Sequence, residues 1–109
     1  MAYKKKNPFY SNKKWIRKRG VVLRKHGYLC AESKQYGKTR QAEVVHHIYP
    51  LEKYPELAYE EWNLLPLTNA VHNTFHDRNN NEVIGRGIYW QNKRRKEFEE
   101  FYSKWGVSN

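Results

Sequence analysis

Residues 44–76 read VVHHIYPLEKYPELAYEEWNLLPLTNAVHNTFH and hold four of the five histidines of the chain. His46 and His47 are adjacent, and neighbouring residues of a strand point to opposite faces of a sheet. Both could be ordinary core residues only if both faces were buried, so a polar environment is expected on at least one side. His72 and His76 are four residues apart, a spacing that brings two imidazoles to one helix face, as in helical zinc sites. This pair predicts two ligands of one metal ion.

Two short strands are predicted around the first pair of histidines. Residues 43–48 (EVVHHI) predict a strand that ends before Pro50. Residues 64–67 (LLPL) predict a second strand, which pairs with the first across a long polar loop. One short helical turn is expected in that loop, after Pro55.

The second strand should be followed by a helix. Thr68 or Asn69 can cap it, and its pattern runs to about Arg78, where three consecutive asparagines break it. Val71 and Phe75 are expected to face the core, which turns the histidines of this helix toward the strands.

Two further helices are expected outside this region. The first runs from a cap at Ser11 to His26 and stops at Gly27. The second covers residues 89–105, with the KRRK run of residues 93–96 on its exposed side. Residues 31–42 are polar and aperiodic and predict a loop. The residues expected in the core are Trp15, Ile16, Val22 and Leu23 of the first helix and Phe98, Phe101, Tyr102 and Trp105 of the second.

The positive charge is confined to one end of the chain. Residues 1–25 carry ten Lys or Arg and no acid, so this segment accounts for the whole net charge of +10. A polyanion is the expected partner, and nucleic acid is favoured over anionic membrane because no apolar face suited to lipid accompanies the charge. No apolar run approaches the roughly 18 residues of a membrane span, and no secretory signal is evident.

The size of the chain allows one small domain. It has 109 residues with 39% hydrophobic content and a mean hydropathy of −1.08, so a bound metal would help to hold the fold together. We expect a basic tail at residues 1–8 and a single domain at residues 9–109. The single cysteine, Cys30, excludes an internal disulfide and a zinc site made of cysteine pairs, and it is expected to be buried.

The histidine-rich region resembles a known family. The run VVHHI, followed by EWNLLPL and then HNTFH, is similar to the motif of the HNH endonucleases, whose ββα-metal fold wraps a β-hairpin and a helix around one metal ion. Residues 9–30 resemble the basic segment that precedes the motif in small phage-type members. The resemblance covers residues 9–78 and implies an α+β fold, with a ββα-metal core at residues 43–78 flanked by N- and C-terminal helices.

The resemblance also implies roles for the motif residues. In this family the residue before the catalytic histidine is a metal ligand, which makes His46 a ligand and His47 the general base. His72 and His76 would complete a three-histidine site, as in some members. Asn63 would brace the loop and orient the base.

The chain departs from many relatives in two ways. Those relatives carry two CxxC pairs that hold a structural zinc, whereas the corresponding places here are Cys30 with Ser33 and Thr68 with Val71. We therefore expect that zinc to be absent and the terminal helices to substitute for it. Many members also have Asp at the position of His46. Three neutral imidazoles form a softer ligand set, so Mg, Mn, Ni and Zn all remain open as the one divalent ion.

The residue types suit phosphodiester hydrolysis. A neutral His47 can take a proton from water, which then attacks phosphorus in line, while a metal ion stabilises the charge on the phosphoryl and leaving oxygens. His47 must stay off the metal, and a carbonyl acceptor on its second nitrogen would fix its tautomer. The predicted N-terminal helix has a basic face without any acid. Such a face is unusual for mere solubility, so contact with phosphate is favoured. The residues expected to contact DNA are Lys13, Lys14, Arg17, Lys18, Arg24 and Arg78.

These observations predict a metal-dependent DNA endonuclease that nicks or cuts duplex DNA with little sequence preference. Phage or prophage origin, action in the cytoplasm of a bacterial host and a packaging terminase as partner are implied by the resemblance. A closed structural metal site is disfavoured, because three histidines with an open position are the catalytic pattern. Two alternatives stay open: a catalytically silent nucleic-acid-binding module, and a nuclease that prefers RNA or structured DNA.

Overall fold

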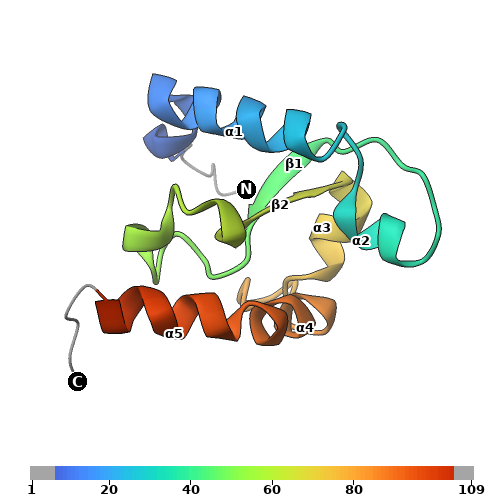
Figure 1. Ribbon diagram of the computed structural model, residues 1–109. Helices are drawn as coiled ribbons and strands as arrows, with labels where there is room; N and C mark the ends of the chain where they lie inside the picture. The colour runs from blue at the N-terminus through green and yellow to red at the C-terminus, as the bar shows by residue number, and fades with distance from the viewer. Residues whose placement is uncertain (1–6, 105–109) are drawn as a thin grey trace, which may run out of the picture.

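The computed structural model describes residues 7–104, which form a two-stranded β-hairpin surrounded by helices (Figure 1). The residues 1–6 of the predicted basic tail and Trp105 lie outside the described residues. In chain order the elements are η1 (Pro8–Ser11), α1 (Lys13–Lys25), α2 (Ala31–Gln35), β1 (Val44–His47), η2 (Pro55–Leu57), η3 (Glu61–Asn63), β2 (Leu64–Leu67), α3 (Asn69–Thr74), α4 (Arg86–Lys93) and α5 (Arg95–Lys104).

The hairpin confirms both predicted strands, and both of its faces are buried. β1 and β2 pair antiparallel, with Val44 opposite Leu67 and His47 opposite Leu64. The face that carries His47 and Leu64 packs against α1. The face that carries Val44 and Leu67 packs on the larger core, which α4 and α5 close from below in Figure 1. Because side chains alternate along β1, its two histidines enter these two separate environments.

The predicted N-terminal helix is present as α1, but its cap differs. The N-cap is Asn12, whose side chain accepts a hydrogen bond from the backbone N–H of Trp15 at 2.8 Å. Ser11, the predicted cap, instead ends the preceding 3-10 turn η1. The predicted stop is confirmed, because Gly27 follows the C-cap His26 with a left-handed φ of 61°.

Three of the four residues predicted to bury the face of α1 do so. Trp15, Val22 and Leu23 are buried against the hairpin. The prediction for Ile16 is wrong, since its side chain is 54% exposed. Ile16 lies about 100° around the helix from Trp15, which takes it off the narrow face that a short hairpin can cover.

The prediction of a loop over residues 31–42 is partly wrong, because α2 occupies its first half. Cys30 is buried as predicted, and its Sγ caps α2 by accepting from the backbone N–H of Ser33 at 3.5 Å. Glu32 is also buried, and it bonds Arg86 Nε at 2.7 Å and Trp90 Nε1 at 2.9 Å. These partners lie more than fifty residues away, so local polarity could not reveal this helix.

The helix after β2 is shorter than predicted. Thr68 caps α3 as expected, but the helix ends at Thr74 with Phe75 as its C-cap. His76 therefore lies beyond the helix, in an isolated β-bridge with Val83. The asparagine-rich segment turns the chain back at this point, where Asn81 adopts a left-handed φ of 61°.

The C-terminal helix predicted over residues 89–105 is two helices. α4 begins earlier, after Gly85 with a φ of 54°, and Arg94 separates it from α5. Arg94 is half-buried and pairs with Glu97 at 3.2 Å, so the KRRK run is not uniformly exposed. The side chains of α5 that pack against the core are, as predicted, Phe98, Phe101 and Tyr102.

Candidate active site

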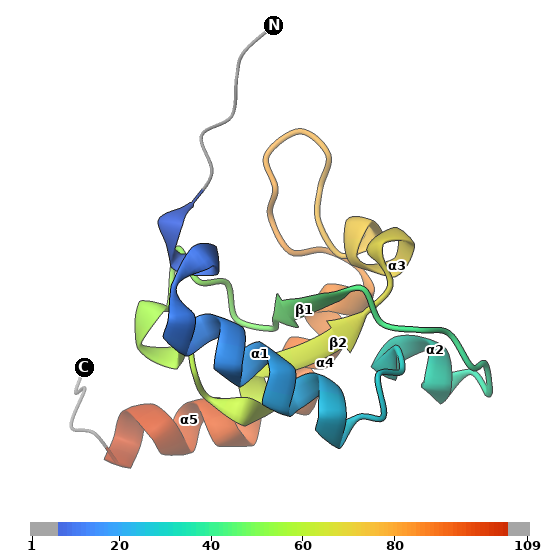
Figure 2. The same ribbon diagram turned by 90° about the horizontal axis from the view of Figure 1, so that it is seen from above.

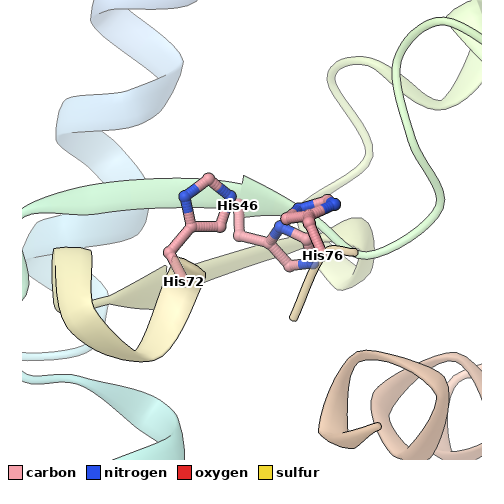
Figure 3. A group of neighbouring side chains, drawn as sticks. All are labelled: His46, His72 and His76. Carbon is pink, nitrogen blue, oxygen red and sulfur yellow. The ribbon is translucent and has the colours of Figure 1, made fainter. Parts of the chain in front are cut away.

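Three of the predicted site residues form a compact cluster. The ring centroids of His46, His72 and His76 lie 5.0 to 5.2 Å apart, and one ligand nitrogen from each lies within 4.8 Å of the other two. Figure 3 shows the ring of His46, which comes from β1, beside the two rings from α3 and the segment that follows it. The loss of helix after Thr74 does not separate His76 from its partners, because the C-cap at Phe75 continues the turn.

The cluster fits a divalent metal ion. His46 is 3% exposed, and among the described residues its Nε2 has no hydrogen-bond partner. Such an orphaned buried nitrogen costs about 1–3 kcal/mol, which a bound cation would offset. Burial holds the pKa of His46 well below its usual value, and burial followed by the nearby His76 lowers the pKa of His72 to about 4. Both imidazoles are therefore neutral at pH 7, as metal ligation requires.

A backbone contact orients the third histidine. His76 Nδ1 lies 3.3 Å from the carbonyl oxygen of Asn81. A carbonyl only accepts, so Nδ1 carries the proton and Nε2 keeps its lone pair. This is the kind of outer contact that fixes the tautomer of a metal-binding histidine.

The predicted base, His47, occupies the opposite face of β1. Its Nε2 donates to the carbonyl oxygen of Ala58 at 3.1 Å, and Nδ1 makes no hydrogen bond within residues 7–104. Its ring stacks on Trp15, with centroids 5.0 Å apart and an interplanar angle of 27°. An edge contact with Phe9 and a tilted contact with Tyr10 complete the surroundings. Burial lowers the pKa of His47, and the Ala58 hydrogen bond opposes that shift. The arrangement leaves one free ring nitrogen on a neutral imidazole.

Asn63 is fully buried and bonds to the loop that follows β1. Its Oδ1 accepts from the backbone N–H of Tyr49 at 2.7 Å. Its Nδ2 donates to the carbonyls of Tyr49 and Leu57, each at 3.2 Å. Leu57 directly precedes Ala58, the hydrogen-bond partner of His47. The contacts of Asn63 thus hold the loop that carries this carbonyl.

The predicted DNA-binding residues fall into two groups. Lys13, Arg17, Arg24 and Arg78 are exposed, and no ion pair engages them in the part of the chain that the structure describes. Two others have protein partners: Lys18 lies 4.0 Å from Glu61, and the Lys14 ammonium stands 4.2 Å from the centre of the Tyr59 ring. Glu61 also pairs with Lys25 at 2.9 Å, so an acid distant in sequence partly neutralises the face.

An open hollow of about 1180 Å³ borders the cluster, and sequence reasoning missed most of its lining. His72, His76 and Arg78 line it together with Asn73 and Asn79. The asparagines are ordinary polar residues by type, so only their place beside the histidines distinguishes them. The Ala58 carbonyl and the Trp15 ring were also missed, since both reach His47 from distant segments.

Comparison with solved structures finds a relative of this chain. The crystal structure of the HNH endonuclease of the deep-sea thermophilic bacteriophage GVE2, with a manganese ion, is 36% identical with a TM-score of 0.59, and the match covers 61% of this chain and 72% of that one. The chain belongs to the HNH endonuclease family. No protein-family model matches it, and a search of curated proteins finds no significant match.

Family membership confirms several predictions. The chain has the HNH fold, in which β1, β2 and α3 form the ββα unit, and it is a metal-dependent nuclease that uses a divalent ion. Which divalent ion this HNH protein uses stays open. Among residues 7–104, no helix is long and apolar enough to cross a membrane.

Proposed function

We propose that this chain is an endonuclease that hydrolyses phosphodiester bonds of duplex DNA with little sequence preference, within one domain at residues 9–109. One observation carries the proposal: adjacent residues of β1 present a metal-ligand cluster on one face and a free imidazole nitrogen on the other. A closed structural metal site would not need the second feature. The exposed cations Lys13, Arg17 and Arg78 support a polyanionic substrate.

The roles of the residues follow from their contacts. His46, His72 and His76 hold the divalent ion, which when bound supplies Lewis-acid stabilisation of charge on the phosphate. His47 accepts a proton from the attacking water at Nδ1, because Nε2 is held by Ala58. Asn63 is a positioning residue that acts through the loop bearing that carbonyl.

The surroundings of His47 favour catalysis without a charged relay partner. Its hydrogen-bond acceptor is a neutral carbonyl, and its neighbours are aromatic rings. Burial among these rings lowers the pKa of His47 and keeps the imidazole neutral before reaction, while the carbonyl fixes its tautomer. The proton that it accepts then passes to solvent or to the departing oxygen.

The biological setting is also a proposal. The GVE2 relative is a bacteriophage protein, and the resemblance to small phage HNH proteins implies a packaging terminase as partner. We therefore propose phage or prophage origin, action in the cytoplasm of a bacterial host and a terminase as partner. Copurification with terminase subunits from infected cells would test the last point.

A plasmid assay tests the activity. Supercoiled plasmid is incubated with the protein and Mg²⁺, Mn²⁺, Ni²⁺ or Zn²⁺, and nicked and linear forms are separated on a gel. We expect cleavage by the parent and by His26→Ala, which removes an exposed histidine outside the cluster, and none by His47→Ala. Absence of cleavage with every metal would favour a silent binding module, and stronger competition by RNA than by DNA would favour an RNA nuclease.

A further inference from the structure

The segment between α3 and α4 is a preformed turn. Asp77 Oδ1 accepts from the backbone N–H groups of Asn79 and Asn80, at 2.8 and 3.3 Å. Asp77 N donates to the carbonyl of Glu82 at 2.8 Å, and Asn81 N donates to that of Asp77 at 2.9 Å. Figure 2 shows this segment extending from the fold beside α3, on the same side of the hairpin as η1. The turn is therefore held in shape by its own hydrogen bonds.

Three contacts fix the turn relative to the rest of the fold. The carbonyl of Asn81 holds His76, and His76 also pairs with Val83 across the base of the turn. Glu82 forms an ion pair with Lys53, at 2.9 Å, in the loop that follows β1. The turn cannot shift far without moving a ligand histidine.

The turn and α3 present unused polar groups to the hollow beside the cluster. Within the described part of the chain, the side chains of Asn73, Arg78 and Asn79 make no hydrogen bond or ion pair, although all three line the hollow. Two other polar side chains of the lining have partners: Thr74 Oγ1 donates to the carbonyl of Val71, and Asn80 Oδ1 accepts from the backbone N–H of Glu82.

These three side chains match the groups of a nucleic-acid strand. A guanidinium binds phosphate oxygens through paired, charge-assisted hydrogen bonds. A carboxamide offers two donors and an acceptor, which suit phosphate and sugar oxygens. All three lie beside His72 and His76, where the scissile phosphate must approach.

We propose that Arg78, Asn79 and Asn73 form a subsite for the sugar-phosphate backbone next to the scissile phosphate. Arg78 binds the neighbouring phosphate, and the two carboxamides bind oxygens of the same strand. The subsite rests on the function proposed above, since it assumes that the cluster marks the place of cleavage. In this proposal the turn binds the substrate in addition to orienting His76.

The test compares DNA affinities of matched variants. Asn73→Ala/Asn79→Ala, Arg78→Gln and the control Asn92→Ala, an exposed asparagine of α4 outside the hollow, are made in the His47→Ala background. Binding to a short fluorescent duplex is followed at several salt concentrations, and repeated in EDTA without the His47 change. Thermal unfolding and Mn²⁺ titration establish that fold and metal site are intact.

We expect the double variant to bind about tenfold more weakly with an unchanged salt slope, because carboxamides displace no counterions. Arg78→Gln should lower the slope of log K against log salt by about 0.9. A double variant that binds within twofold of Asn92→Ala would overturn the subsite, whether or not the parent cleaves plasmid. Loss of affinity in the double variant together with an inactive parent would support the subsite and overturn the nuclease function. Absence of DNA binding by the parent would overturn both.

Discussion

His46 and His47 are neighbours in the chain, yet their rings occupy different environments. The ring of His46 faces two other imidazoles and has an unsatisfied buried nitrogen. The ring of His47 faces Trp15 and has one nitrogen tied to a backbone carbonyl. The pleat of a strand alone separates the two sets of contacts. The proposed ligand and the proposed base are thereby kept apart although they are adjacent in the chain.

The buried amide of Asn63 should contribute to the stability of the fold. Asn63→Ala should lower the free energy of unfolding by about 3 kcal/mol, because it leaves backbone groups of Tyr49 and Leu57 without partners. Urea denaturation measures this loss. Asn92→Ala, at an exposed position, is the control and should change stability by less than about 0.5 kcal/mol. Equal stability of the two variants would show that Asn63 does not brace the loop.

The depressed pKa values predict a pH dependence of stability without metal. The folded-state pKa of His72 is about 4, below the ordinary 6.5, and burial lowers that of His46 too. The unfolded chain therefore binds more protons between these values, so stability should fall as pH drops from about 6.5 toward 4. Denaturation of the metal-free protein at pH 7 and pH 5 measures this. His72→Gln should flatten the dependence, and an unchanged profile in that variant would contradict the assignment.

At the scale of elements, an ion pair joins α2 to α4. The places of the zinc cysteines hold residues that cap helices: Cys30 caps α2, and Thr68 caps α3 by accepting from Val71 N at 3.1 Å. Glu32 then ties α2 to α4 through Arg86 and Trp90. An ion pair and two helix caps thus stabilise these elements.

Breaking this link should destabilise the fold. Glu32 is 6% exposed, so Glu32→Gln leaves the Arg86 guanidinium without its counterion and should cost about 2 kcal/mol of unfolding free energy. The matched control is Glu99→Gln, which removes an exposed pair with Arg95 and should change little. Chemical denaturation of both variants measures their free energies of unfolding. A cost for Glu32→Gln no greater than for Glu99→Gln would show that α2 and α4 are held by packing alone.

Local patterns predicted some elements and missed others for identifiable reasons. The β-branched run before His46 predicts β1, and the spacing of Trp15, Val22 and Leu23 predicts α1. Both signals are local in the sequence, and both elements were predicted. α2 depends on partners in α4, so polar letters alone indicated a loop. The early end of α3 depends on the turn centred on Asn79.

The candidate site likewise contains features that the sequence predicts and features that it does not. The four histidines and Asn63 could be predicted, because motif spacing reports them directly. The Ala58 carbonyl could not, since any backbone carbonyl looks alike in sequence. The asparagines that line the hollow could not be predicted either, because only the folded structure places them beside His72 and His76.

At the scale of the whole molecule, the exposed cations of α1 should determine how DNA binding responds to salt. Replacing the five predicted DNA-binding residues of α1 by Gln should lower the slope of log K against log salt by about 3, since two of them already have protein partners. The five are Lys13, Lys14, Arg17, Lys18 and Arg24. Affinity measured at several salt concentrations tests this. The control replaces the exposed Lys93, Arg95 and Lys96. A larger loss in the control would place DNA along α4 and α5 instead.

The most direct measurement titrates Mn²⁺ into His47→Ala and His76→Ala and assays cleavage by the same samples. We expect His47→Ala to bind the ion as the parent does but not to cleave DNA. His76→Ala should bind it at least tenfold more weakly and lose the stabilisation that the ion gives. Loss of metal affinity in His47→Ala, with full affinity in His76→Ala, would contradict the assignment of base and ligands.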